Sequence, residues 1–213
     1  MALDNYTDLQ VEIADYLARD DLNSKIPTFI ALCEAKLNRE LYVRQMEQRS
    51  TVVIDTTSAE PEFISLPDDF QSMRSIRLKS TTGRTRLEYK AGVALDEYQT
   101  QIVNRTGEPK YFTIIGDEIE LSPTPDDAYT IEMVYRKTIP SLVDNGTNWL
   151  LTLAPDVYLY GALLEASPYI RNDERISVWG SAFASAIDSL SRLGLAASYN
   201  AGPLQVQISG ITP

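Results

Sequence analysis

The sequence predicts an α+β fold in which helices from both ends of the chain enclose a β-rich segment. Apolar residues recur every three to four positions near both ends, which is typical of amphipathic helices. Between these regions the apolar pattern alternates, which indicates strands. We therefore expect residues 1–49 and 148–195 to form an antiparallel four-helix bundle. Residues 50–147 are then an inserted antiparallel β domain, and residues 196–213 an extended C-terminal arm.

The first of two N-terminal helices is expected to begin at Thr7, because Thr7-x-x-Gln10 fits a capping box. Its apolar face consists of Leu9, Ile13, Tyr16 and Leu17. The second helix is expected from about Ser24 to Gln48. Its apolar stripe consists of Ile26, Ile30, Cys33, Leu37 and Leu41. Because Cys33 falls on this stripe, we interpret it as a small core residue and not as a reactive thiol.

The β segment contains short alternating runs, and its prolines lie between these runs, where they interrupt no ladder. The predicted strands are 51–54, 75–78, 112–114, 119–121 and 129–135. Gly116-Asp117 separates the third run from the fourth and predicts a hairpin turn. A short helix is expected at about 93–101.

Two C-terminal helices are expected at about 155–168 and 173–193, with Gly194 as a stop signal. Within residues 157–166 only Glu165 is charged, so the first of these helices is apolar on every face. Such a helix must be covered all round, by its own fold or by a neighbouring subunit. The apolar face of the second helix consists of Ile176, Trp179, Phe183, Ile187 and Leu190.

The composition excludes many catalytic and metal sites. The 213 residues include no histidine and one cysteine, so histidine-dependent nucleophiles and Cys/His metal sites are impossible. We expect no cofactor and no enzymatic activity. No run of about 18 apolar residues occurs, so no membrane span is expected. A lone cysteine can form no internal disulfide, which is compatible with a reducing cytoplasm.

The net charge of −11 is spread along the chain, and none of the three segments 1–49, 50–147 and 148–213 is basic in total. We therefore expect no tight binding to the phosphate backbone of nucleic acid. Four pairs of adjacent acids also occur, at Asp20-Asp21, Asp68-Asp69, Asp117-Glu118 and Asp126-Asp127. A glycosidase needs two carboxyl groups that face each other across a cleft, so these pairs are interpreted as solvated loop residues. Asp144-Asn145-Gly146 is interpreted as a turn, since no complete calcium-binding loop follows it.

Short motifs extend along most of the chain. In the first helical region they are Tyr6-Thr7-Asp8-Leu9, Ile26-Pro27-Thr28-Phe29-Ile30, Glu34-x-x-Leu37-x-Arg39-x-Leu41 and Arg44-Gln45-Met46-Glu47. In the β segment they are Leu66-Pro67-x-Asp69-Phe70, Gly107-x-Pro109-x-x-Phe112 and Glu120-Leu121-Ser122-Pro123-x-Pro125. In the last region they are Asn148-Trp149-Leu150-Leu151, Pro155-Asp156-x-Tyr158-Leu159-Tyr160-Gly161 and Asp173-Glu174-x-x-x-x-Trp179. In their order and spacing they resemble the head-to-tail adaptor (connector) proteins of tailed bacteriophages, the group that includes podophage tail tubular protein A.

This resemblance implies a structural protein that forms a ring, usually of twelve copies, below the portal. Such a ring extends the DNA channel and provides the attachment platform for the tail. The implied partners are the portal protein, a tail tube or nozzle protein and further copies of the chain. Double-stranded DNA is expected to pass through the channel without specific binding. The implied location is the virion neck, at the head–tail junction, and the host cytoplasm during assembly.

The C-terminal arm is the predicted contact with the portal or with an adjacent subunit, because related adaptors use terminal extensions in this way. Its alternating run, Leu204-Gln205-Val206-Gln207-Ile208, suits addition to the edge of a sheet. The predicted partner-binding residues are Tyr199, Leu204, Val206, Ile208 and Ile211.

A carbohydrate- or receptor-binding virion module remains an alternative, because tyrosines of the β segment can stack on sugars. The candidates are Tyr89, Tyr98, Tyr111, Tyr129 and Tyr135. This function requires several of these rings to be exposed on one face.

Overall fold

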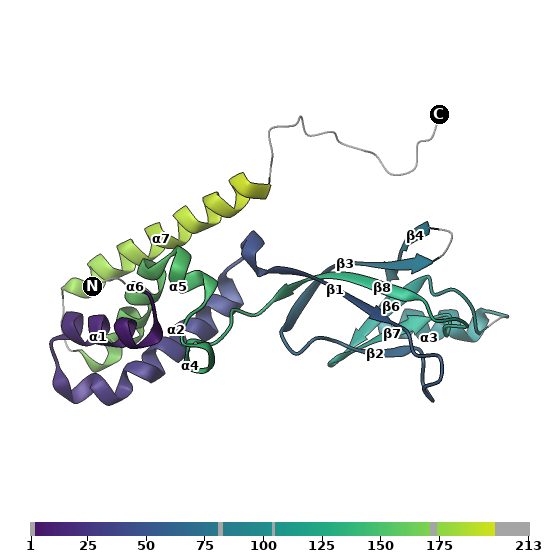
Figure 1. Ribbon diagram of the computed structural model, residues 1–213, viewed down its shortest axis with the longest axis horizontal. Coiled ribbons are helices and arrows are strands. Elements are labelled where there is room, and N and C mark those ends of the chain that lie inside the picture. The colour runs from purple at the N-terminus through teal and green to yellow at the C-terminus, as the bar shows by residue number, and fades with distance from the viewer. Residues whose placement is uncertain (1–2, 81–82, 104, 171–173, 199–213) are drawn as a thin grey trace. The chain divides into compact units, whose positions relative to one another are not determined.

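The protein consists of two units, which we describe separately (Figure 1). The computed structural model describes residues 3–80, 83–103, 105–170 and 174–198. The first unit, here called the helical unit, takes the chain up to Gln45 and again from Ile139 onward. The second, here called the β unit, is Met46–Thr138. The chain therefore passes from one unit to the other twice.

Helices from both ends of the chain pack against one another in the helical unit. They are α1 (Tyr6–Leu17), α2 (Ile26–Glu40), α4 (Leu142–Asn145), α5 (Trp149–Leu153), α6 (Pro155–Glu165) and α7 (Arg175–Ser198). Helix α6 contacts α1, α2, α5 and α7, and α1 also contacts α2. The prediction that helices of both terminal regions associate is confirmed, with α6 as their common neighbour.

Helix α6 is covered on all but one narrow stripe, along which Asp156 is exposed and Tyr160 and Leu164 are half-buried. Its buried residues are Val157, Tyr158, Leu159, Gly161, Ala162 and Leu163. The helix ends at Glu165, three residues earlier than predicted, and a 3₁₀ turn follows at Ser167–Tyr169. Pro168 accounts for the difference, because proline has no amide hydrogen and its ring clashes with the preceding helical turn.

The ends of the first two helices differ from the prediction. The cap of α1 is Asn5 and not Thr7, because the Asn5 side chain accepts hydrogen bonds from the amides of Thr7 and Asp8 at 2.9 and 3.0 Å. Helix α2 ends at Glu40, near the end of the apolar stripe at Leu41, whereas the helix was predicted to continue to about Gln48. Residues Glu47–Val53 form strand β1, whose pairing with a distant strand overrides the local helical pattern.

Helix α7 continues through Gly194, the predicted stop signal, to Ser198. A Cβ added at Gly194 would lie in ordinary van der Waals contact with the Cβ of Val43, at 3.5 Å, so this glycine is a buried helical position that faces Val43 and not a helix end. Trp179 and Leu190 are buried as predicted, while Phe183 is half-buried.

Two four-stranded sheets form the β unit. The first has the order β1-β8-β3-β4 and consists of Glu47–Val53, Thr130–Lys137, Phe70–Ser80 and Gly83–Arg86. The second has the order β2-β7-β6-β5 and consists of Phe63–Ser65, Glu118–Ser122, Tyr111–Ile115 and Glu88–Tyr89. The predicted hairpin joins β6 to β7 around Gly116, whose φ of 59° suits glycine.

The β unit is not wholly antiparallel, which corrects the prediction. Strand β5 pairs with β6 in parallel, because helix α3 (Gly92–Gln101) lies in the connection between them. This helix was itself predicted. The core of the unit consists of Ile54, Ile64, Ile76, Leu78, Leu87, Phe112, Ile119, Leu121, Ile131, Met133 and Tyr135.

The buried face of α7 generates the first prediction. Trp179 is 3% exposed, and we expect Trp179→Ala to lower the free energy of unfolding by about 3–5 kcal/mol, because a large cavity is left. The neighbouring Val178 is 62% exposed, so Val178→Ala should change it by less than about 0.5 kcal/mol. Urea unfolding measures both changes. Equal effects of the two substitutions would show that this face is not core.

The contact between α2 and α6 generates the second prediction. An added Cβ at Gly161 would lie 2.4 Å from the Cys33 Sγ and 3.0 Å from Cε2 of Phe183. We expect Gly161→Ala to destabilise the protein by about 1–3 kcal/mol through overpacking. Gly180→Ala is the control, because the nearest atom to its added Cβ is 4.0 Å away.

Cys33→Ala removes the Sγ atom that the new Cβ of Gly161→Ala would overlap. The double variant should therefore be more stable than the sum of the two single effects implies. Strict additivity in chemical unfolding would contradict this close approach of the two helices.

Candidate functional site

The partner-binding residues predicted from the sequence are Tyr199, Leu204, Val206, Ile208 and Ile211. They lie outside the described residues, so their role stays a prediction. The described residues offer four features to consider: a pocket, a set of tyrosines, a buried polar network, and exposed apolar and charged surfaces.

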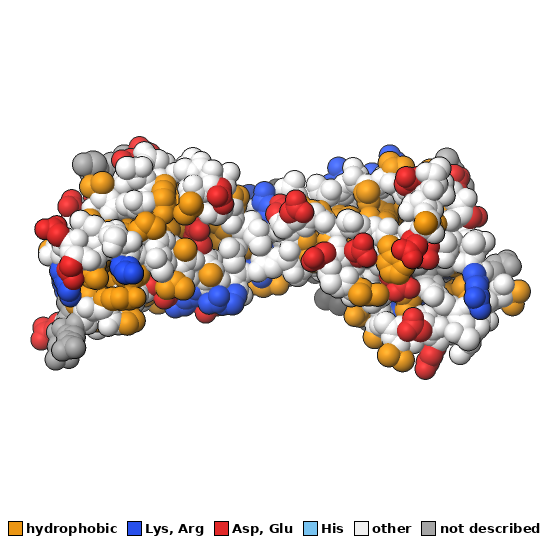
Figure 2. Space-filling view, turned by 90° about the horizontal axis from the view of Figure 1, so that it is seen from below, with side chains coloured by type: hydrophobic (Ala, Val, Ile, Leu, Met, Phe, Trp, Pro, Cys, Tyr) orange, Lys and Arg blue, Asp and Glu red, His pale blue; other side chains and the backbone are white. Residues whose placement is uncertain are grey.

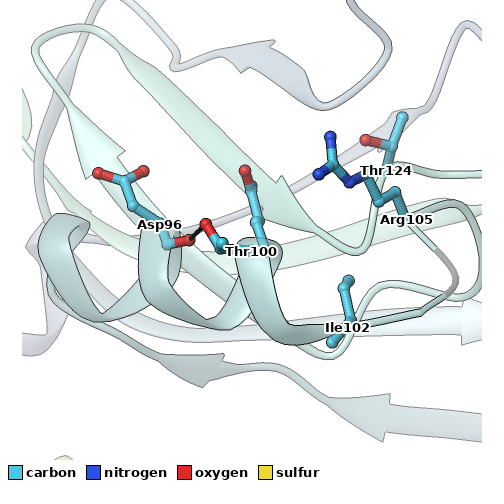
Figure 3. A pocket seen from close by; sticks show the side chains of 6 residues that line it. Asp96, Thr100, Ile102, Arg105 and Thr124 are labelled. Carbon is cyan, nitrogen blue, oxygen red and sulfur yellow. Dashed lines mark hydrogen bonds between the residues drawn. The ribbon is translucent and has the colours of Figure 1, made fainter.

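A solvent-accessible pocket of about 360 Å³ lies beside α3 in the β unit (Figure 3). Its lining residues are Asp96, Gln99, Thr100, Ile102, Arg105 and Thr124. Figure 3 shows Asp96 and Thr100 on the helix and Arg105 and Thr124 beyond its end, and the Thr100 hydroxyl donates to the Asp96 carbonyl at 2.9 Å. This lining pairs no nucleophile with a base, so it does not constitute a catalytic site.

The paired acids have structural roles where their contacts are described. Asp69 accepts a hydrogen bond from the Tyr135 hydroxyl at 2.7 Å, and Asp126 accepts one from the Tyr129 hydroxyl at 2.7 Å. Within the described ranges, no three His, Cys, Asp or Glu side chains converge to hold a metal ion. The helices in the same ranges are too short or too polar to cross a membrane.

The tyrosines of the β unit do not form a platform for sugars. Tyr135 is 3% exposed, and Tyr98 and Tyr111 pack edge-to-face with centroids 4.7 Å apart. The Lys90 ammonium lies 4.4 Å from the Tyr111 centroid, above the ring. Of the five candidates, Tyr89 alone is an exposed ring, at 63%. The geometry therefore does not favour the carbohydrate-binding alternative.

A buried polar network joins α2 to the chain that follows the β unit. The Glu34 carboxylate accepts hydrogen bonds from the Leu142 amide at 2.9 Å and from the Tyr158 hydroxyl at 3.2 Å. Asn148 donates to the same hydroxyl at 2.7 Å, and its side-chain oxygen caps α5 by accepting from the Leu151 amide at 2.9 Å. The network thus fixes the path of residues 139–151 over the helices.

The sequence contains a signal for this network. Glu34, Asn148 and Tyr158 all belong to motifs that carry the family resemblance, although the motifs alone indicate no role for them. Glu34 also lies next to the apolar stripe of its helix, and a charged residue in that position has to find a partner in the fold. The partner itself lies more than 100 positions away, so local periodicity could not identify it.

Burial raises the pKa of three titratable groups in this region, Glu34, Tyr158 and Cys33. Burial raises the pKa of Glu34, and the hydrogen bonds from Leu142 and Tyr158 oppose this shift. Burial also raises the pKa of Tyr158. It raises the pKa of Cys33 to about 12, and nearby Glu165 and Glu34 add to the effect. A thiol with this pKa stays protonated and is a poor nucleophile, so Cys33 is confirmed as a core residue.

Several large apolar side chains of the helical unit are exposed. On α7 these are Val178, Leu193 and Leu195, which are 62%, 49% and 59% exposed. Leu32 on α2 and Tyr42 after it are exposed by 48% and 70%. Figure 2 shows hydrophobic side chains between charged ones on the face of this unit that is turned to the viewer. Apolar side chains of this kind are candidates for contacts with other proteins.

Strand alternation gathers cations on one face of the first sheet. In β8, Ile131, Met133 and Tyr135 point into the core, so Glu132 and its cross-strand neighbours lie on the opposite side, here called the outer face. The exposed cations of the outer face are Arg49, Arg74, Arg77, Lys79, Arg84 and Arg86. They are six of the 11 Lys and Arg residues of the β unit.

Two acids accompany these cations. Glu132 Oε2 lies 2.7 Å from Arg49 Nη2 and 3.9 Å from Arg84 Nη2, while Arg74 pairs with Glu47. The hydrogen bond from Arg49 lowers the pKa of Glu132. The expectation that no region is basic, which rests on totals over long segments, is therefore wrong for this face. Five of its six cations lie within residues 70–87, which contain no acid, and the acidic total of residues 50–147 conceals them.

The buried carboxyl group generates the third prediction. The pKa of Glu34 is raised in the folded protein above the ordinary glutamate pKa of 4.5. As the pH rises past 4.5, the Glu34 carboxyl group therefore loses its proton in the unfolded chain before it does so in the folded protein. The folded state then binds more protons, so the contribution of Glu34 to stability decreases with rising pH until the raised pKa is passed. Glu34→Gln removes this titration. The stability of the wild type relative to the variant should fall through this window in urea unfolding.

Glu40→Gln is the matched control, because Glu40 is an exposed carboxylate near the end of the same helix. Its stability relative to the wild type should vary less with pH. A difference between wild type and Glu34→Gln that is constant with pH would contradict the shifted pKa.

The comparison with known proteins agrees with this non-catalytic picture. No curated protein matches the chain, but the family model described as SU10 adaptor protein matches residues 4–207, which covers both units. This confirms the resemblance to phage adaptor proteins, whereas the grouping with podophage tail tubular protein A is not confirmed. The chain therefore belongs to the SU10 adaptor protein family, and it is a structural head–tail adaptor of a phage and not an enzyme.

Proposed function

We propose that the chain is one subunit of a ring of twelve copies that lies below the portal in the virion neck. The ring extends the DNA channel and provides the attachment platform for the tail, with the portal protein and a tail tube or nozzle protein as partners. Assembly takes place in the host cytoplasm, and DNA passes through the ring without recognition of its sequence. The family match over residues 4–207 is the observation that supports this proposal.

The surface of the helical unit suits a ring. In a cyclic ring each subunit uses two different patches, one for each neighbour. Val178, Leu193 and Leu195 on α7 and Leu32 on α2 supply exposed apolar area on separate helices. We further propose that α1, α2, α6 and α7 form the antiparallel bundle that presents these side chains.

The C-terminal arm, residues 196–213, is the proposed contact with the portal or with the next subunit. The alternation around Val206 supports this role, because an alternating segment can add to an open sheet edge with one set of side chains facing its partner. Tyr199, Leu204, Ile208 and Ile211 complete the proposed set of contact residues.

Electron microscopy of the chain mixed with its portal protein tests the ring. We expect a collar of subunits at one end of the portal. A portal that stays bare in the presence of excess chain would reject the proposal.

Truncation tests the arm and supplies the fourth prediction. Deletion of residues 199–213 should leave the unfolding transition unchanged, because the described core lies outside this segment. Binding to the portal should weaken by at least about tenfold, which corresponds to about 1.4 kcal/mol. Undiminished binding of the truncated chain would remove the arm from the interface while leaving the ring itself untouched.

A further inference from the structure

The outer face of the β1-β8-β3-β4 sheet carries an arrangement of charges that does not favour the free protein. Arg77 of β3 lies directly opposite Arg86 of β4, and Lys79 lies directly opposite Arg84. Like charges in directly opposed positions destabilise a pair of strands. Two such pairs follow each other on one short hairpin, although the chain as a whole is acidic. An anion bound over them would relieve this repulsion.

Ion pairs within the face leave most of this charge uncompensated. Glu132 is engaged by Arg49 at 2.7 Å, with Arg84 farther away at 3.9 Å, and Glu47 is engaged by Arg74. The outer face therefore carries six exposed cations against two acids. Its excess positive charge lies on the β3–β4 side, around Arg77, Lys79 and Arg86.

From this arrangement we propose that the outer face binds the phosphate backbone of double-stranded DNA. Cations at alternate positions of a strand are about 7 Å apart, and about 7 Å of duplex carries about four phosphate charges. The two opposed pairs supply four cations over that length. Contacts to phosphate carry no sequence information directly, so this site holds DNA irrespective of its bases.

An acidic surface of a second copy fits the face less well. The acids of the β unit are distributed over its turns, its strands and α3, and several already serve the fold. Asp69 and Asp126 accept hydrogen bonds from tyrosine hydroxyls, and Asp127 accepts one from the Ala128 amide at 2.7 Å. They do not form a dense anionic strip of the kind that a duplex provides. The face of the β unit turned to the viewer in Figure 2 shows its acids as separate groups.

The net charge of −11 does not prevent this binding. At physiological ionic strength charges are screened beyond about 8 Å, so a phosphate in contact with the outer face responds mainly to the cations beneath it. The rest of the acidic surface repels the duplex and leaves the outer face as the favoured point of contact. The site goes beyond the proposed ring and does not depend on it.

The test uses the full chain and a fluorescently labelled duplex of about 24 base pairs, titrated between about 25 and 200 mM salt. Four phosphate contacts predict that log K falls with log salt with a slope of about −3.6. Arg77→Gln with Arg86→Gln should reduce this slope to about −1.8 and weaken binding at the lowest salt by at least about tenfold.

The matched control is Arg105→Gln with Lys110→Gln, which removes two exposed cations of the same unit that lie outside the outer face. This pair should leave the slope near that of the wild type. Thermal melts show whether each variant folds. The melting temperature of Arg77→Gln with Arg86→Gln should be equal to or higher than that of the wild type, because one repulsive pair is gone.

A wild-type chain that leaves the duplex unbound at the lowest salt would overturn the proposal, as would equal slopes in the two double variants. Sedimentation in the same buffers tests whether a second copy of the chain binds the outer face instead. If the chain binds no DNA but self-associates at low salt, and Arg77→Gln with Arg86→Gln abolishes that self-association, the outer face is an interface between two copies. Portal docking is measured separately and should survive this substitution, so failure of the ring and failure of the DNA site are distinguishable.

Discussion

The burial of α6 is the constraint on which the helical unit depends. A helix of about three turns without a polar face is stable in water only when neighbours cover most of its surface, and α1, α2, α5 and α7 supply that cover. Two local features allow the neighbouring helices to pack closely around α6. Gly161 has no side chain where α2 approaches, and the Tyr158 hydroxyl finds Glu34 and Asn148 as partners in the interior.

The same constraint explains why the helical unit can take chain from both ends of the sequence. Helix α6 belongs to the C-terminal part, while α1 and α2 belong to the N-terminal part, so neither part buries its apolar surface alone. The β unit has its own core and is bounded by the paired strands β1 and β8, whose outer ends meet the two crossings. An insertion of this kind changes the chain length between helices without disturbing their packing.

Local patterns predicted those elements whose own residues determine them. The burial of α6, the β6–β7 hairpin around Gly116 and the core position of Cys33 follow from periodicity, turn chemistry and composition. The end of α2, the continuation of α7 through Gly194 and the partners of Glu34 did not follow, because each involves residues far away in the sequence. Of the site, the family motifs indicated an adaptor, but they did not indicate which side chains meet in space.

For charge the limit is a different one, because long segments were averaged. The totals over residues 1–49, 50–147 and 148–213 are all acidic and suggest repulsion of DNA throughout, although residues 70–87 contain five cations and no acid. Strand alternation then sorts these residues by side, and the strand order brings Arg77 opposite Arg86 while Glu132 stays on the neighbouring strand. Cations on β4 also protect this edge strand from pairing with another chain, but that role does not require further cations directly opposite them on β3. Opposed like charges destabilise the strand pair, and the proposed anionic partner offsets that cost; a DNA duplex has a matching charge density.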